Sequence, residues 1–205
     1  SKIFHVEPMS AEGLIGLAQQ FDASSVHWLF TLQSEAETLA DLGYQHRVTV
    51  QHTWTNNGYK TFDDFLATMK SRKRKAIKRE RRIASGHGLF MGVFRGTEMN
   101  DEQWQAVHRY YLRGCQRYGS TPYLRDDFFP WLRTHFADRV LCSMARDDAA
   151  PDGPKWVAAT LNFQRGNNLY GRYWGCDSEH YALHFELAFY RLIEQCIAQG
   201  WQRFE

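Results

Sequence analysis

Apolar and polar residues follow two periods along this chain, a period of two in some segments and about 3.6 residues in others. From Tyr44 to Trp54 one parity carries the aromatic residues, the histidines and the valines, while the other carries only Gln, Arg and Thr. Such alternation predicts a half-buried strand. Further strands are predicted at residues 89–94, 140–145, 156–163, 169–174 and 201–205. Turn-rich segments join the middle three of these, so we expect an antiparallel meander.

Helices are predicted where a capping signature precedes a stripe of apolar residues. Three pairs place a side-chain acceptor three residues before Glu, Asp or Gln, as a capping box does. These pairs are Ser34 with Glu37, Thr61 with Asp64, and Asn100 with Gln103. The predicted helices cover residues 34–43, 61–84, 100–119, 126–136 and 180–199. In the last helix the expected core positions are Phe185, Phe189, Leu192, Ile193 and Cys196.

Composition narrows the class of protein. Apolar residues make up 43% of the 205 residues, yet no stretch approaches the about 20 consecutive apolar residues of a membrane span. The first residues lack the basic-then-apolar order of a secretory signal. The four cysteines stand 27, 34 and 20 positions apart, without CxxC spacing, so we expect reduced thiols and no disulfide. A cytoplasmic globular protein fits these features.

Several segments resemble a known family. Residues 62–66 with the basic run 71–82 are similar to the opening helix of Fem-like acyltransferases. Residues 123–125, 170–175 and 184–186 resemble a bacterial family of predicted N-acyltransferases associated with peptidoglycan biosynthesis or recognition. The resemblance covers nearly the whole chain. It implies the GNAT-type acyl-CoA N-acyltransferase fold, an α/β (α+β) architecture in which helices flank a mixed, mostly antiparallel sheet.

The resemblance also implies a domain division and a donor. Residues 1–60 would end a preceding GNAT-like lobe, and residues 61–205 would form a GNAT-like acyltransferase domain whose C-terminal strands are truncated. Acetyl-coenzyme A enzymes of this fold usually present Arg/Gln-x-x-Gly-x-Gly/Ala between a strand and a helix, where backbone N–H groups hold pyrophosphate. Here residues 172–177 fill that place and end on Asp177, which would repel phosphate. Aminoacyl-tRNA is therefore the favoured donor, acyl-CoA is the alternative, and no other cofactor is expected.

Positive charge is concentrated in one predicted helix. The net charge is only +2, yet nine of the thirteen residues from 70 to 82 are Lys or Arg. Like charges four residues apart on a helix repel, which favours an anionic or phosphorylated ligand such as tRNA over a merely solvated surface. The candidate binding residues are Arg72, Arg74, Lys75 and Arg79. We expect Phe65, Met69, Ile77 and Ile83 to be buried and Arg72, Lys75, Arg79 and Arg82 to be exposed.

His184 and Glu186 are the candidate proton acceptors. A histidine with a pKa near ~6.5 suits proton removal from an ammonium group, and Glu186 is a candidate base or anchor for the substrate amine. The alternatives are a buried, hydrogen-bonded histidine and an ion pair between Glu186 and an arginine of the basic helix. His180 stands four residues before His184, but the pattern supplies no third ligand, so we expect no metal.

Tyr173 is the candidate proton donor to a leaving group, a role that tyrosines have in several acyltransferases of this fold. Aromatic packing is the alternative. The odd spacing from Tyr170 to Tyr173 predicts that the two side chains point to opposite faces of the strand. The remaining candidate substrate-binding residues are Tyr123, Arg125, Arg172 and Trp174.

The resemblance implies an N-acyltransferase that moves an acyl or aminoacyl group from an activated donor to an amine, in cell-wall precursor metabolism. The alternative is a non-catalytic module of the same fold that binds nucleic acid or an anionic glycan through its basic helix.

Overall fold

The computed structural model describes residues 8–29, 31–48 and 50–205, with side chains from residue 11 onward. The chain divides into two compact units, residues 1–51 and residues 52–205. The boundary between the units lies earlier in the sequence than the expected one at residue 60, because Trp54 and Thr55 form a strand of the second unit. Within the described ranges, no helix combines the length and the apolar character needed to cross a bilayer.

The described part of the first unit contains two helices, α1 (Pro8–Gln20) and α2 (Gln33–Asp41). Helix α2 begins two residues earlier than a cap at Ser34 would place it, because its N-cap is Leu32, whose backbone N–H donates to the Glu35 carboxylate at 2.8 Å. The Tyr44 hydroxyl donates to the carbonyl oxygen of Ala11 at 3.0 Å and links the segment after α2 to α1.

The prediction of a strand from Tyr44 to Trp54 is wrong for most of these residues. Among the described residues of this segment, only Trp54 lies in a strand, the two-residue β1 (Trp54–Thr55), and Thr49 is outside the described residues. Val48 and Val50 are 80% and 81% exposed. Alternation indicates which side chains share a face, but a strand also needs a neighbour for its backbone groups.

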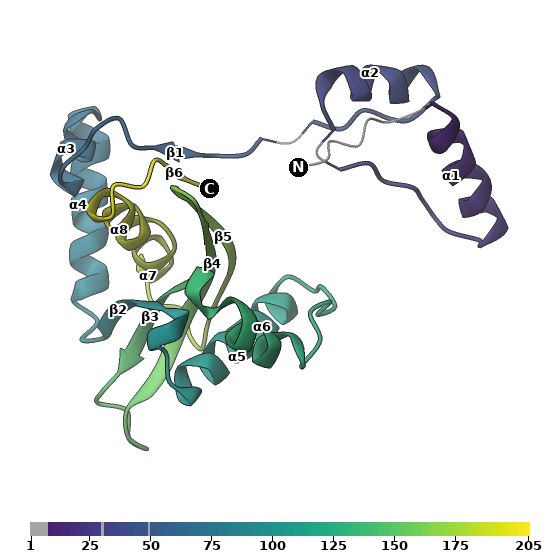
Figure 1. Ribbon diagram of the computed structural model, residues 1–205. Coiled ribbons are helices and arrows are strands. Elements are labelled where there is room, and N and C mark those ends of the chain that lie inside the picture. The colour runs from purple at the N-terminus through teal and green to yellow at the C-terminus, as the bar shows by residue number, and fades with distance from the viewer. Residues whose placement is uncertain (1–7, 30, 49) are drawn as a thin grey trace. The chain divides into compact units, whose positions relative to one another are not determined.

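The second unit is built on one six-stranded sheet with the order β1-β6-β5-β4-β3-β2. Its other strands are β2 (Phe90–Arg95), β3 (Val140–Asp147), β4 (Lys155–Arg165), β5 (Asn168–Cys176) and β6 (Arg203–Phe204). Strands β5 and β6 run parallel, and all other neighbours are antiparallel. The predicted meander is confirmed, and the mixed sheet flanked by helices is the expected GNAT-type α/β fold (Figure 1).

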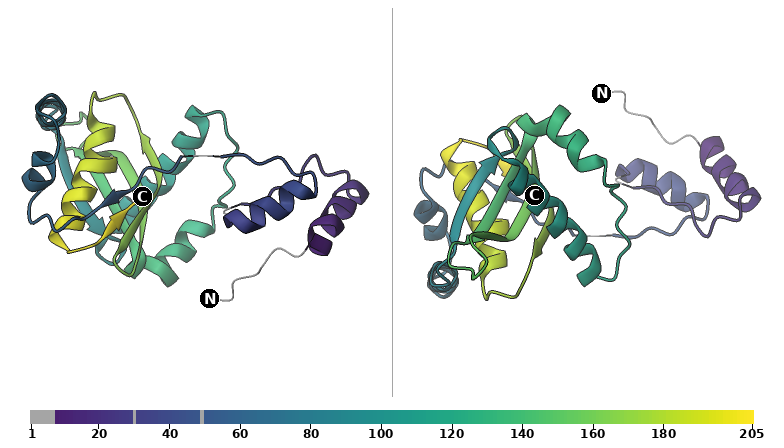
Figure 2. Two further views of the ribbon diagram at one scale, coloured as in Figure 1. Left: turned by 90° about the horizontal axis from the view of Figure 1, so that it is seen from above. Right: turned by 90° about the horizontal axis from the view of Figure 1, so that it is seen from below.

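Helices cover both faces of this sheet (Figure 2). On one face lie α5 (Asp101–Arg117), which Asn100 caps with Gln103 as predicted, and α6 (Phe128–Phe136), followed by the 3₁₀ turn η2 (Ala137–Arg139). Their core includes Trp104, Tyr110, Tyr111, Phe129 and Leu161. On the other face lie α3 (Phe62–Ala67), α4 (Ser71–Ser85) and α8 (Arg191–Ala198). Their core includes Phe62, Leu66, Ile77, Leu192 and Cys196.

The predicted long basic helix is interrupted once. Residues 68–70 separate α3 from α4, and the Thr68 hydroxyl donates to the Phe65 carbonyl oxygen at the end of α3. The Thr61–Asp64 capping box forms as predicted. The amphipathic character of α4 is confirmed, with Ile77 buried at 3% exposure. Phe65, Met69 and Ile83 are half-buried, while Arg72, Lys75, Arg79 and Arg82 are exposed.

The last helix contains a π turn that the sequence pattern did not reveal. The helix starts at Leu183, later than predicted, and passes from α7 (Leu183–Phe185) through the π turn η3 (Glu186–Tyr190) into α8. A π turn inserts one extra residue into the helix. The side chains before it are therefore rotated about the helix axis relative to the apolar stripe that follows it. Phe185 and Phe189 are consequently 48% and 42% exposed instead of buried, and Leu183, Glu186, Leu187 and Tyr190 take the inward positions.

Candidate active site

Strand β5 carries several of the predicted site residues, and a β-bulge decides which way they point. Tyr170 pairs with Phe163 of β4, whereas Tyr173 pairs with Leu161, so Arg172 is an extra residue in β5. Phe163 and Leu161 are two residues apart on β4 and share a face. Tyr170 and Tyr173 therefore face the same side of the sheet, the side covered by α5. The prediction of opposite faces is wrong because the bulge changes the parity of the strand.

Three tyrosines from three segments meet on this side of β5. The hydroxyl groups of Tyr123 and Tyr173 form a hydrogen bond. The ring of Tyr111, from α5, packs edge-on against Tyr173 with the centroids 4.8 Å apart. The Tyr111 hydroxyl oxygen accepts the backbone N–H groups of Tyr123 and Leu124, each at 2.9 Å, and so holds the loop after α5 in place. Burial and the contact with Tyr123 raise the pKa of Tyr173, so this phenol keeps its proton at neutral pH.

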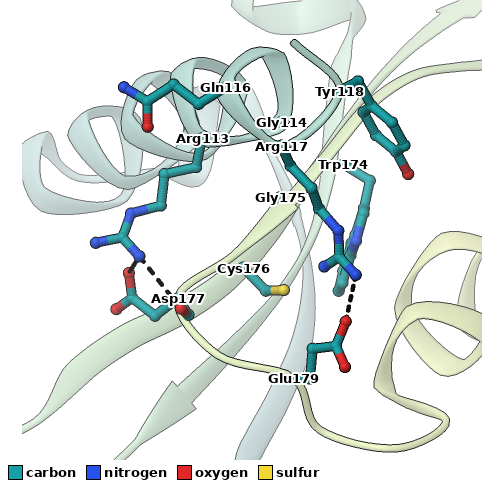
Figure 3. A pocket seen from close by; sticks show the side chains of 10 residues that line it. All are labelled: Arg113, Gly114, Gln116, Arg117, Tyr118, Trp174, Gly175, Cys176, Asp177 and Glu179. Atoms are coloured by element: carbon teal, nitrogen blue, oxygen red, sulfur yellow. Dashed lines mark hydrogen bonds and ion pairs between the residues drawn. The ribbon is translucent and has the colours of Figure 1, made fainter.

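A pocket of about 660 Å³ lies between the C-terminal half of α5 and the end of β5 (Figure 3). Asp177, which is 13% exposed, pairs with Arg113 at 3.0 Å and with Lys155 at 3.0 Å. Arg117 pairs with Glu179. The charged side chains that line this pocket therefore neutralise one another.

The floor of this pocket depends on two glycines where α5 crosses β5. A Cβ atom on Gly175 would lie 2.1 Å from the carbonyl oxygen of Tyr110, and one on Gly114 would lie 2.7 Å from that of Trp174. Both distances are shorter than a van der Waals contact. Only glycine at each position permits this approach of helix to strand.

Trp174 and His184 meet on the other side of β5. Their ring centroids are 5.0 Å apart, and His184 also contacts Phe185 and Phe189. Burial, and to a smaller extent the charge of Arg117, lower the pKa of His184. His180 lies before the helix and packs against His87, so it does not form the helical pair with His184 that a shared metal would need.

Glu186 lies in a buried ion-pair network. Its side chain is 2% exposed, and its carboxylate oxygens lie 3.1 Å from Nε of Arg81 and 3.2 Å from Nε of Arg191. Arg81 also reaches Glu194 at 2.8 Å, and the Tyr190 hydroxyl donates to Glu80. These contacts connect α4 to the π turn. The predicted alternative, an ion pair with an arginine of the basic helix, is confirmed, and the geometry gives no support to Glu186 as a base.

The sequence profile of the FemAB-like family, described as peptidoglycan biosynthesis/recognition, matches residues 5–205. The chain belongs to the FemAB-like family. A search of curated proteins found no match to this FemAB-like chain.

Two solved structures share the fold, and a third is similar over a shorter part of this chain. L-PGS from Bacillus licheniformis superposes with a TM-score of 0.55 and 12% identity over 96% of this chain and 56% of its own. FemX superposes with a TM-score of 0.51 and 11% identity over 99% of this chain and 69% of its own. The C-terminal domain of a putative lysylphosphatidylglycerol synthetase from Agrobacterium fabrum has a TM-score of 0.49 and 9% identity over 68% and 43%. The FemAB-like chain thus spans about half the length of L-PGS and of the Agrobacterium fabrum domain.

The connection from β5 to the helix of this FemAB-like chain differs from the predicted phosphate loop. Residues 172–176 lie within β5, and α7 begins only at Leu183, so Asp177 is not at the start of a helix. The backbone N–H of Asp177 donates to the carbonyl oxygen of Val157 instead of facing a ligand. The connecting residues 177–182 contain no glycine. The prediction that Asp177 occupies the pyrophosphate position is therefore wrong.

The structure brings some predicted site residues together and separates others. Tyr123 and Tyr173 meet, and Trp174 meets His184 on the opposite face of β5. Arg125 is 84% exposed and pairs with Asp127 at 3.3 Å. The sequence reasoning missed Tyr111, because nothing in the helix pattern distinguishes its hydroxyl from a core ring.

Proposed function

We propose that this FemAB-like chain transfers an aminoacyl group from an activated ester to an amine of a peptidoglycan precursor. The observation that carries the proposal is the Tyr123–Tyr173 hydrogen bond on the bulged strand β5. Family membership supports the link to peptidoglycan. The transfer forms a C–N bond, breaks the ester C–O bond, moves a proton to the leaving alkoxide and removes one from the amine.

Tyr173 fits the role of proton donor to the leaving group. Its raised pKa keeps the phenol protonated until a stronger base, such as a departing alkoxide, forms beside it. Tyr123 is 72% exposed and contacts the Tyr173 hydroxyl, so it offers a path for the proton to be replaced from solvent. Tyr111 positions this pair through the backbone of the Tyr123 segment.

His184 is the proposed acceptor of the amine proton. Its lowered pKa leaves the imidazole neutral at pH 7, the form that can take up a proton. It lies on the face of β5 opposite Tyr173. Strand β6 pairs only with Asn168 and Leu169, and within the described residues no strand pairs with the edge of β5 from Arg172 to Cys176. A substrate that crosses this edge would reach both faces.

Helix α4 supports a phosphate-rich donor, for which we propose aminoacyl-tRNA. Its exposed side carries Arg72, Lys75, Arg79 and Arg82. Arg74 is half-buried and donates to the carbonyl oxygen of Met69, so it contributes less to this surface. The same exposed side also supports the second candidate function, a non-catalytic module that binds nucleic acid or an anionic glycan.

A transfer assay tests the proposal. The purified chain is incubated with aminoacyl-tRNA or acyl-CoA and a muropeptide precursor, and the products are analysed by mass spectrometry. We expect a mass increase of one aminoacyl residue that depends on Tyr173. Binding of tRNA with no product, equal for wild type and Tyr173→Phe, would instead favour the binding module.

A further inference from the structure

A second depression, of about 750 Å³, lies at the opposite end of β5 from the pocket of Figure 3. Three arginines from three different elements line it. Arg139 comes from η2, Arg165 from the last position of β4, and Arg172 from the bulge of β5. Three aromatic side chains line it as well, those of Phe136, Phe163 and Tyr170. Among the residues that the structure describes, no acidic side chain lines it.

The arginines of this pocket are poorly neutralised by their neighbours. Within the described residues, neither Arg165 nor Arg172 forms an ion pair with a carboxylate, whereas Arg113 and Arg117 of the first pocket both do. Arg172 donates to its neighbouring backbone carbonyl, that of Gly171, and lies over the Tyr170 ring at 5.6 Å. Arg139 pairs with Asp138 at 3.1 Å, but both side chains are more than half exposed, so this pair is weak. The pocket therefore retains positive charge.

Guanidinium groups in such an arrangement select for oxyanions. Each presents a planar fork of N–H donors that matches two oxygens of a phosphate, and a phosphate accepts such forks from several directions. The volume is that of a small-molecule site, larger than a single ion requires. The aromatic side chains offer apolar contact to the group that carries the phosphate.

We infer that this pocket, with Arg165 and Arg172 as its main ligands, binds the phosphate of a phosphate ester. Because the bulge places Tyr170 on the same face as Tyr173, the ligand extends along β5 toward the Tyr123–Tyr173 pair. This last placement rests on the proposed function. The binding itself does not, and the test below uses no transfer reaction.

Calorimetry with inorganic pyrophosphate at moderate ionic strength tests the site. We expect saturable binding that weakens about tenfold or more in Arg165→Gln and in Arg172→Gln, because each loses a charge-assisted contact. The matched control is Arg133→Gln, which removes the same charge from a side chain of α6 that pairs with Asp101, the first residue of α5, at 2.7 Å. The control should bind as the wild type does, and melting temperatures check that all three variants fold.

Vesicles distinguish a lipid headgroup from a free phosphate ester as the source. Binding to phosphatidylglycerol vesicles but not to phosphatidylcholine vesicles, lost in the two pocket variants and displaced by pyrophosphate, assigns the site to a lipid headgroup. Pyrophosphate binding without vesicle binding assigns it to a phosphate ester in solution. The inference is overturned if pyrophosphate does not bind, or if Arg133→Gln weakens binding as much as the pocket variants do.

Discussion

Replacement of Glu186 by Gln separates a structural role of this residue from a catalytic one. The carboxylate is buried between Arg81 and Arg191 at 3.1 and 3.2 Å. Removing one partner of a buried ion pair leaves charge uncompensated and costs about 3–5 kcal/mol. Gln keeps the volume and one acceptor oxygen, so we expect about 3 kcal/mol. A loss of that size lowers the melting temperature of a domain of this length by about 6–12 °C.

The free energy of unfolding is measured by urea titration, followed by tryptophan fluorescence, and kcat is measured at a temperature where both proteins are folded. We expect kcat to stay within about threefold of the wild type. Glu194→Gln is the matched control, because Glu194 contacts the same Arg81 but is 49% exposed. A half-exposed ion pair contributes about 1 kcal/mol or less.

The opposite pattern would refute this reasoning. If Glu186→Gln unfolds with the wild-type free energy while kcat falls more than about a hundredfold, Glu186 acts on the substrate. A double-mutant cycle with Arg81→Met adds a second check, since side chains in one ion-pair network show a coupling free energy of about 0.5–3 kcal/mol. Additive effects of the two substitutions would argue against the network.

Three further predictions concern the proposed reaction. Tyr173→Phe keeps the ring but removes the proton donor, so kcat falls about 10²–10⁴-fold in the transfer assay. Replacing Arg72 and Arg79 by Gln weakens tRNA binding and lowers the slope of log K against log salt concentration by about one per charge removed. Lys78→Gln is the control and changes the slope less, because Lys78 already pairs with Asp63. Because the pKa of His184 is lowered, its contribution to stability is present above the ordinary histidine value of about 6.5 and is lost as the pH falls below it. His184→Gln should abolish this loss of stability at low pH, and also the fall of kcat/KM at low pH. A fall of kcat/KM at low pH that is unchanged in the variant would exclude His184 as the base.

Local signals predicted much of the fold. The capping boxes at Thr61 and Asn100 and the three strands of the meander depend on neighbours within a few residues, and all are confirmed. The predictions that proved wrong each failed because of one local change, either a missing strand partner or one inserted residue. Of the described residues in the predicted strand 44–54, only Trp54 has a strand partner, and the π turn shifts Phe185 and Phe189 to the surface.

The candidate site was predictable only in part. Tyr123 and Tyr173 were identified separately, but their contact depends on the bulge at Arg172, which adds a residue without leaving a sequence signature. Arg139 and Arg165 were missed because they are 26 positions apart and neither lies in a charge cluster. Residues that are distant in the sequence and meet only in the folded protein produce no periodic pattern in the sequence.

The glycine contact between α5 and β5 limits how the selectivity of the proposed transfer reaction can change. With the backbones in contact at Gly114 and Gly175, the helix can neither slide along the strand nor tilt away without opening the core beneath it. Sequence variants that widen or narrow the site by moving α5 would therefore unfold the domain. Selectivity can diversify instead in the two loops that follow these elements, residues 119–127 and 177–182. Libraries for altered acceptor use should vary those residues while keeping Tyr123, which contacts Tyr173, and both glycines.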